Sequence, residues 1–211
     1  MRRDVDYSIY LVTDRDLMSA PTIEAAVESA LRGGCTVVQL REKSASSREF
    51  FETARRVKAV TDSFDVPLII NDRLDIALAI EADGLHVGQS DIPADVAKRL
   101  IPPDMILGVS ASNLEEAAAA AAAGADYLGV GAMFPTGTKT DADLTSMDEL
   151  CRIRDEVSIP IVVIGGINAQ NAPLFREARV DGLAVVSAVI GAPDIEAAAA
   201  KLKSAFAGQE I

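Results

Sequence analysis

The chain has 211 residues, of which 49% are hydrophobic and 25% are charged. This length fits one large α/β domain, and the composition excludes a disordered, collagen-like or coiled-coil chain. The 32 acidic and 20 basic residues give a formal net charge of −12, which argues against non-specific binding of nucleic acid. A small anionic ligand is not excluded, provided that basic side chains are gathered at one site.

The two cysteines, Cys35 and Cys151, form no close-spaced metal or redox motif. Free thiols in a reducing compartment are favoured over one disulfide between them. The N-terminal segment has no apolar run of signal-peptide length, and the longest apolar stretches are far below the ~20 residues that span a bilayer. We therefore expect a cytoplasmic protein that does not bind membranes; both a monomer and a homo-oligomer stay open.

In chain order, short β-branched apolar runs alternate with longer amphipathic segments. The predicted strand–helix pairs are 8–13 with 22–32, 36–40 with 46–62, 67–71 with 74–81, 84–88 with 93–100, 105–110 with 113–123, 127–131 with 146–157, 160–166 with 169–178, and 183–187 with 194–206. The strands are continuous apolar runs, which is typical of buried parallel strands. Eight such units predict an α/β fold, a single-domain (β/α)8 TIM barrel over residues 1–211, with an open doubly wound sheet as the alternative.

In a barrel of this kind, active sites lie at the carboxyl ends of the strands. After the second strand, Gln39, Arg41 and Lys43 share one side of the chain because alternate residues of a strand share a face. Two cations and an amide at the barrel mouth are costly unless a polar or anionic ligand meets them. We expect an anion site here; the alternative is an exposed basic strand end.

Asn71 and Asp72 follow the third strand, and Asp91 follows the fourth. Both segments have a structural alternative, because Asn-Asp favours turns and Asp91 can cap the next helix. Two carboxylates from neighbouring strand ends are also suited to share one Mg²⁺, which proteins usually hold with few oxygens plus a substrate phosphate.

The loop after the sixth strand contains Thr136, Thr138 and Lys139. Its hydroxyls, free backbone donors and single cation suit an oxygen-rich anionic ligand. A solvated surface loop of similar composition is the alternative.

A glycine pair and a serine follow the last two strands. Gly165-Gly166 ends the seventh strand, and Val186-Ser187 follows the eighth. Phosphate sites in these barrels are commonly built from these two loops and a short helix N-terminus. Gly166, Val186 and Ser187 are therefore candidate phosphate ligands; glycines needed only for packing are the alternative.

The single histidine, His86, lies within an apolar strand and is interpreted as structural. The sequence offers no Ser–His–Asp set and no Cys–His pair with an orienting acid. Acyl transfer is therefore not expected.

With these clusters taken together, the sequence resembles the thiamine-phosphate synthase family of barrel enzymes. Eight segments carry the resemblance in chain order: YLVTD, QLREK, INDR, DGLHVGQSD, GVS, DYLGVGAMFPTGTK, PIVVIGGI and GLAVVSAV. One such string is a weak match, but eight in order, each at a strand end and together spanning almost the whole chain, are specific.

The resemblance implies a substrate pair and a set of site residues. The family joins 4-amino-5-hydroxymethyl-2-methylpyrimidine diphosphate to 4-methyl-5-(2-phosphoethyl)thiazole and releases pyrophosphate. By match to its motifs, the pyrimidine diphosphate is assigned to Gln39, Arg41, Lys43, Asn71 and Lys139. Mg²⁺ is assigned to Asp72 and Asp91, and the thiazole phosphate to Thr136, Thr138, Gly166, Val186 and Ser187, with Ser110 near the reacting groups.

The family's reaction is understood as dissociative: diphosphate leaves first, and the thiazole nitrogen captures the pyrimidine cation. Such a step needs charge stabilisation on the leaving group, which Mg²⁺ together with Arg41, Lys43 and Lys139 can provide. We expect these three basic residues and Arg73 to gather at the barrel mouth. The step needs little acid–base machinery, which agrees with the lack of a catalytic histidine or nucleophile.

The chain departs from the family pattern at two places. Ser112 stands where the family usually has a histidine, and the stretch after Lys139 lacks the glycine that often precedes the sixth helix. Related thiazole tautomerases use a histidine near position 112 and lack the PTGTK loop, so both features favour the synthase. An isomerase of a phosphorylated thiazole or sugar and a non-catalytic binder are the other hypotheses; Asp72, Asp91 and Lys139 argue against the binder.

Overall fold

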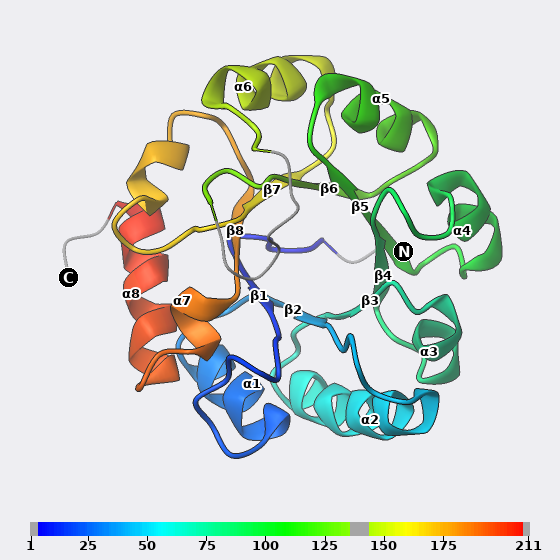
Figure 1. The fold of residues 1–211 in the computed structure, drawn as a ribbon, viewed down its shortest axis with the longest axis vertical. Helices are drawn as coiled ribbons and strands as arrows, with labels where there is room; N and C mark the ends of the chain where they lie inside the picture. The colour runs from blue at the N-terminus through cyan, green and yellow to red at the C-terminus, as the bar shows by residue number, and fades with distance from the viewer. Residues whose placement is uncertain (1–3, 136–143, 209–211) are drawn as a thin grey trace.

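The computed structural model describes residues 4–135 and 144–208. In this part of the chain, eight parallel strands close into a barrel in sequence order, and the last strand pairs with the first (Figure 1). The strands are β1 (Ile9–Val12), β2 (Val37–Leu40), β3 (Leu68–Asn71), β4 (Gly84–Val87), β5 (Ile106–Ala111), β6 (Tyr127–Val130), β7 (Ile161–Ile164) and β8 (Gly182–Val185). The predicted TIM barrel is confirmed, and the open sheet is excluded.

Helices surround the barrel (Figure 1). They are α1 (Ile23–Arg32), α2 (Ser47–Ser63), α3 (Leu74–Ala79), α4 (Ala94–Leu100), α5 (Leu114–Ala122), α6 (Met147–Glu156), α7 (Ser187–Ile190) and α8 (Ile195–Ala207), with a 3-10 turn, η1 (Ala172–Phe175), after β7. Among the described residues, no helix combines the length and apolar character needed to cross a membrane.

Several helices begin at a side chain that accepts a hydrogen bond from an otherwise unpaired backbone N–H group. Thr22, Asn113 and Ser146 cap α1, α5 and α6 in this way. Ser46 caps α2 in a full capping box with Glu49. Each cap of this kind stabilises its helix by about 1 kcal/mol.

The helix predicted over residues 169–178 is wrong, because only the short turn η1 forms in this segment. Asn171 Nδ2 donates to the Gly166 carbonyl at 2.9 Å, and the Asn168 N–H donates to Asn171 Oδ1 at 2.8 Å. These local bonds compete with the helical ladder, and Pro173 has no N–H to give to it.

The barrel interior is packed by aromatic rings at the level of the strands. Tyr7, Tyr10 and Tyr127 belong to a hydrophobic cluster that also contains side chains from neighbouring strands. The ring centroids of Tyr10 and Tyr127 lie 5.8 Å apart. Gly108 on β5 makes room for Tyr127, because a Cβ there would overlap the ring. A second, larger core lies between the strands and the helices. The tyrosines thus close the barrel interior and form a floor toward its carboxyl end.

The two cysteines are free, as predicted: Cys35 is buried and Cys151 is exposed. Burial raises the pKa of the Cys35 thiol to about 12. A neutral buried thiol behaves as a small apolar side chain, so Cys35 belongs to the packing of the barrel and its helices.

Candidate active site

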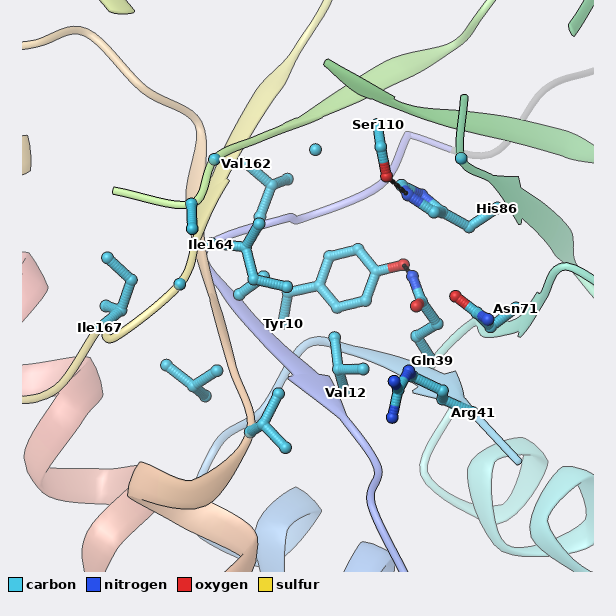
Figure 2. A pocket seen from close by; sticks show the side chains of 18 of the residues that line it. Tyr10, Val12, Gln39, Arg41, Asn71, His86, Ser110, Val162, Ile164 and Ile167 are labelled. Carbon is cyan, nitrogen blue, oxygen red and sulfur yellow. Dashed lines mark hydrogen bonds between the residues drawn. The ribbon is translucent and has the colours of Figure 1, made fainter. Parts of the chain in front are cut away.

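A cavity of about 1150 Å³ opens at the carboxyl ends of the strands. It is lined by every predicted site residue that the structure describes: Gln39, Arg41, Lys43, Asn71, Asp72, Asp91, Ser110, Gly166, Val186 and Ser187. The predicted residues Thr136, Thr138 and Lys139 lie outside the described residues. Figure 2 shows Gln39, Arg41 and Asn71 together on one side of this cavity, across from Ile164 and Ile167. Strand alternation therefore correctly predicted that Gln39, Arg41 and Lys43 face the same side, because all three line the cavity.

Each of the two cations after β2 already has a carboxylate partner. Arg41 donates to Asp14 Oδ2 at 3.1 Å, and its backbone N–H donates to Thr13 Oγ1 at 3.0 Å. Lys43 Nζ donates to Asp72 Oδ2 at 2.8 Å. These pairs hold both cations in place at the cavity wall, while Lys43 stays exposed enough to change partner.

Arg73, which we expected to join these cations at the barrel mouth, does not line the cavity. Its guanidinium donates to both carboxylate oxygens of Asp75, at 2.8 and 2.6 Å, and to Ser47 Oγ at 2.9 Å. The expectation is wrong because Asp72 adopts a left-handed backbone conformation, with φ +63°, which turns the chain before Arg73.

Asp72 and Asp91 are the predicted metal ligands, and their carboxylates face each other across the ends of β3 and β4. Burial, and next the Asp72 carboxylate, raise the pKa of Asp91, although the Gly88 N–H donates to Asp91 Oδ2 at 2.7 Å and acts in the opposite direction. Two oxygen donors that repel each other suit a hard divalent cation. Within the described ranges no set of three or more acidic, histidine or cysteine side chains is placed to hold a metal, so a cation here would need ligand or water oxygens as well.

The opposite part of the wall, at the ends of β7 and β8, offers backbone groups and a hydroxyl. Gly165 and Gly166 have φ of +99° and +66°, a region that favours glycine, and a Cβ on Gly166 would lie 2.7 Å from Phe134 Cβ. Ser187 is the first residue of α7, and Val186 precedes it. The missing Cβ atoms let this loop pack against the segment after β6, as the packing alternative expected, and both glycines also line the cavity.

The floor between these two walls is a set of polar side chains that are buried, apart from the half-buried Ser110. Gln39 Nε2 donates to Tyr10 Oη at 2.8 Å, and the hydroxyls of Tyr10 and Tyr127 share a 2.6 Å hydrogen bond. His86 lies 2.8 Å from Tyr127 Oη through Nδ1 and 2.9 Å from Ser110 Oγ through Nε2. Burial lowers the pKa of His86 to about 4, so the imidazole is neutral near pH 7.

Sequence reasoning missed Tyr10 and Tyr127 as site residues and interpreted His86 as structural, yet all three line the cavity. One signal was available. Tyr10 and Tyr127 stand inside predicted buried strands, and a buried tyrosine hydroxyl usually needs a polar partner.

Ser112, at the position where the resemblance led us to expect a histidine, lines the cavity together with Glu116. Its N–H and its hydroxyl donate to Glu116 Oε2 at 2.7 and 3.0 Å. The serine therefore fixes a carboxylate at the rim, where an imidazole would have offered a titratable ring.

Comparison with known proteins agrees with this geometry. A family model described as thiamine monophosphate synthase matches residues 9–189. The thiamine-phosphate synthase of Clostridium beijerinckii is 61% identical over 206 residues, which cover 98% of this chain and 99% of that protein. A solved structure of thiamine phosphate pyrophosphorylase from Pyrococcus furiosus superimposes with a TM-score of 0.89 at 40% identity and covers 96% of both chains. The chain therefore belongs to the thiamine-phosphate synthase family of TIM-barrel enzymes.

Proposed function

We propose that the cavity joins 4-amino-5-hydroxymethyl-2-methylpyrimidine diphosphate to 4-methyl-5-(2-phosphoethyl)thiazole, releasing pyrophosphate and forming thiamine phosphate. One observation carries this proposal: a single cavity has a charged wall at the ends of β2–β4 and a backbone-rich wall at the ends of β7 and β8. Two phosphorylated small molecules can therefore bind side by side, with their reacting atoms over the uncharged floor between the walls.

The charged wall suits the diphosphate. In our proposal the pyrimidine diphosphate is held by Gln39, Arg41, Lys43, Asn71 and Lys139. Arg41 and Lys43 would stabilise the negative charge that develops on the departing diphosphate, and preorganised cations do this best in a site with little water. The pairing of both cations with aspartates supports this role, because it holds them at the wall before the ligand arrives.

Asp72 and Asp91 would hold Mg²⁺ against the diphosphate. When bound there, the ion would supply further charge neutralisation on the leaving group. The closely spaced carboxylates, and the need for further oxygens from a ligand, agree with the usual way in which Mg²⁺ is held.

The backbone-rich wall suits the thiazole phosphate. In our proposal its ligands are Thr136, Thr138, Gly166, Val186 and Ser187. Ser110, on β5 between the two walls, would contact the reacting groups. The apolar side chains of Val162 and Ile164 on β7 would exclude water from the pyrimidine cation after the diphosphate has left. Held in line above the floor, the thiazole nitrogen would then form the new carbon–nitrogen bond.

The test is one assay on the purified chain. Both substrates and MgCl₂ are mixed with the protein, and thiamine phosphate and pyrophosphate are followed together. We expect equimolar products, loss of both when either substrate is omitted, and strong inhibition by a chelator. Arg73→Ala is the matched cation control, because Arg73 lies outside the cavity. No product from this pair, despite measurable binding of the thiazole phosphate, would refute the proposal.

A further inference from the structure

The five polar side chains of the floor form one continuous line of hydrogen bonds. It runs from Gln39 on β2 through Tyr10 on β1, Tyr127 on β6 and His86 on β4 to Ser110 on β5. Both tyrosines are completely buried, with at most 1% of their surface exposed. The two end residues face the cavity, and Figure 2 shows Gln39 against the Tyr10 hydroxyl and His86 turned toward Ser110.

The orientation of the Gln39 amide gives this line a direction. Its Nε2, which can only donate, faces Tyr10 Oη. The proton of Tyr10 is then available to Tyr127, and the proton of Tyr127 is available to Nδ1 of His86. A neutral His86 that accepts at Nδ1 carries its proton on Nε2 and donates to Ser110 Oγ.

With the amide in this orientation, the opposite direction leaves a donor unpaired. If Tyr127 donated to Tyr10, the Tyr10 proton would meet Nε2 of Gln39, another donor, within the hydrogen bonds that the described residues form. A buried hydroxyl proton without an acceptor costs free energy, whereas a line in which every donor meets an acceptor avoids this cost. The direction that runs from Gln39 to Ser110 is the one in which every donor of the line has an acceptor.

We propose that this line positions Ser110: Gln39 sets the direction, His86 is held as the neutral Nε2–H tautomer, and the Ser110 hydroxyl proton is left to donate into the cavity. Tyr10, Tyr127 and His86 are positioning residues, because they act through Ser110. The direction of the hydrogen bonds does not depend on the proposed function. Its consequence for turnover rests on that function, in which Ser110 contacts the reacting groups.

The chain contains a single histidine, so its imidazole can be observed directly. The full chain, labelled with ¹⁵N at histidine and purified without a histidine tag, is studied by long-range ¹H–¹⁵N NMR near pH 7.5. Nε2 couples through two bonds to both carbon-bound ring protons, whereas Nδ1 couples in this way to one, which identifies each nitrogen. We expect the proton on Nε2. A proton on Nδ1 in the unmodified protein would overturn the proposal.

Gln39→Glu provides a sharper test of the direction. A carboxylate of nearly the same shape accepts and does not donate, so Tyr10 would turn its proton toward residue 39 and each later bond would reverse. We expect a proton to appear on Nδ1 of His86 in this variant. An Nδ1 that stays unprotonated would show that Gln39 does not set the direction.

Tyr127→Phe and Tyr10→Phe form a matched pair. Removal of the Tyr127 hydroxyl takes the donor away from Nδ1 of His86, so its ¹⁵N resonance should move to higher frequency; removal of the Tyr10 hydroxyl leaves that donor in place. The turnover rate of Tyr127→Phe should be about fivefold to tenfold lower than that of the unmodified chain, which corresponds to the loss of one hydrogen bond. The turnover rate of Tyr10→Phe should fall by a smaller factor. Equal effects of the two variants on the Nδ1 resonance would contradict the proposal. If the unmodified chain makes no thiamine phosphate, the proposed function fails while the NMR result still decides the direction.

Discussion

Gly108→Ala should damage the floor of the active site without touching any proposed substrate contact. A Cβ at this position on β5 would lie less than 3.0 Å from Cζ, Oη and Cε1 of Tyr127. Ordinary carbon contacts are about 3.5–4.0 Å, so the tyrosine ring would have to move by roughly 1 Å. Such a shift breaks the 2.6 Å bond to Tyr10 and the 2.8 Å bond to His86.

The expected loss combines two costs. Overpacking of a dense core costs about 1–3 kcal/mol, and a buried polar group left without its partner costs about 1–3 kcal/mol more. Loss of glycine's freedom in the unfolded chain returns about 0.4–1 kcal/mol. The net loss in the free energy of unfolding is therefore about 1–6 kcal/mol, or a fall of roughly 2–24 °C in the thermal midpoint for a chain of this size.

Gly129→Ala is the matched control, because Gly129 also faces the barrel interior from the next strand. Its Cβ would lie 3.0 Å from His86 Cε1 and 3.5 Å from Nε2, so a small shift of the ring accommodates it. Urea unfolding followed by circular dichroism would give both free energies. If Gly108→Ala were no less stable than Gly129→Ala, the inferred collision with Tyr127 would be refuted.

Three further predictions follow from charge and burial. Asp91→Asn removes one of two repelling carboxylates, so without metal its thermal midpoint should rise by about 1–2 °C while turnover falls; a lower midpoint in calorimetry would argue against repulsion. A thiol reagent at pH 8 should modify Cys151 in the native protein and Cys35 after unfolding, because burial raises the pKa of Cys35 to about 12; rapid native labelling of both would contradict this. Lys139→Ala should lower turnover about 100-fold, whereas Arg73→Ala should lower it less than about threefold. Equal losses in steady-state assays would contradict the assignment of Lys139 to the active site.

The barrel was predictable because buried parallel strands leave continuous apolar runs, and all but one of the predicted runs end at a polar or glycine residue. The 3-10 turn at Ala172–Phe175 was not, although Pro173 lay inside the predicted helix. Apolar spacing reports which face a helix would bury. It does not report whether the side chains of Asn168 and Asn171 bind the local backbone first, and here they do.

The charged wall was predictable for a similar reason, and the floor was not. Alternation along a strand is a local property, so it predicted that Gln39, Arg41 and Lys43 share one side, and all three line the cavity although β2 itself ends at Leu40. The hydroxyls of Tyr10 and Tyr127 meet across 117 residues of sequence, and that contact depends on how β1 and β6 face each other through the barrel. The sequence indicates that each buried tyrosine hydroxyl needs a hydrogen-bond partner, but the arrangement of the strands in the closed barrel determines which partner it meets.

At the charged wall, as in the whole chain with its net charge of −12, acidic side chains offset the basic ones. Arg41 and Lys43 are each neutralised by an aspartate, so the wall has no large positive field with which to attract a simple anion. A diphosphate that arrives with a divalent cation presents both signs of charge. In the proposed function the diphosphate oxygens would bind Lys43 and the accompanying cation would bind Asp72. Neither member of the existing Lys43–Asp72 pair would then be left without a partner. An anion without a metal would have to separate that pair and leave a carboxylate beside its own charge, which opposes binding. If the proposed function holds, the charged wall would therefore favour metal-bound diphosphates over free phosphates.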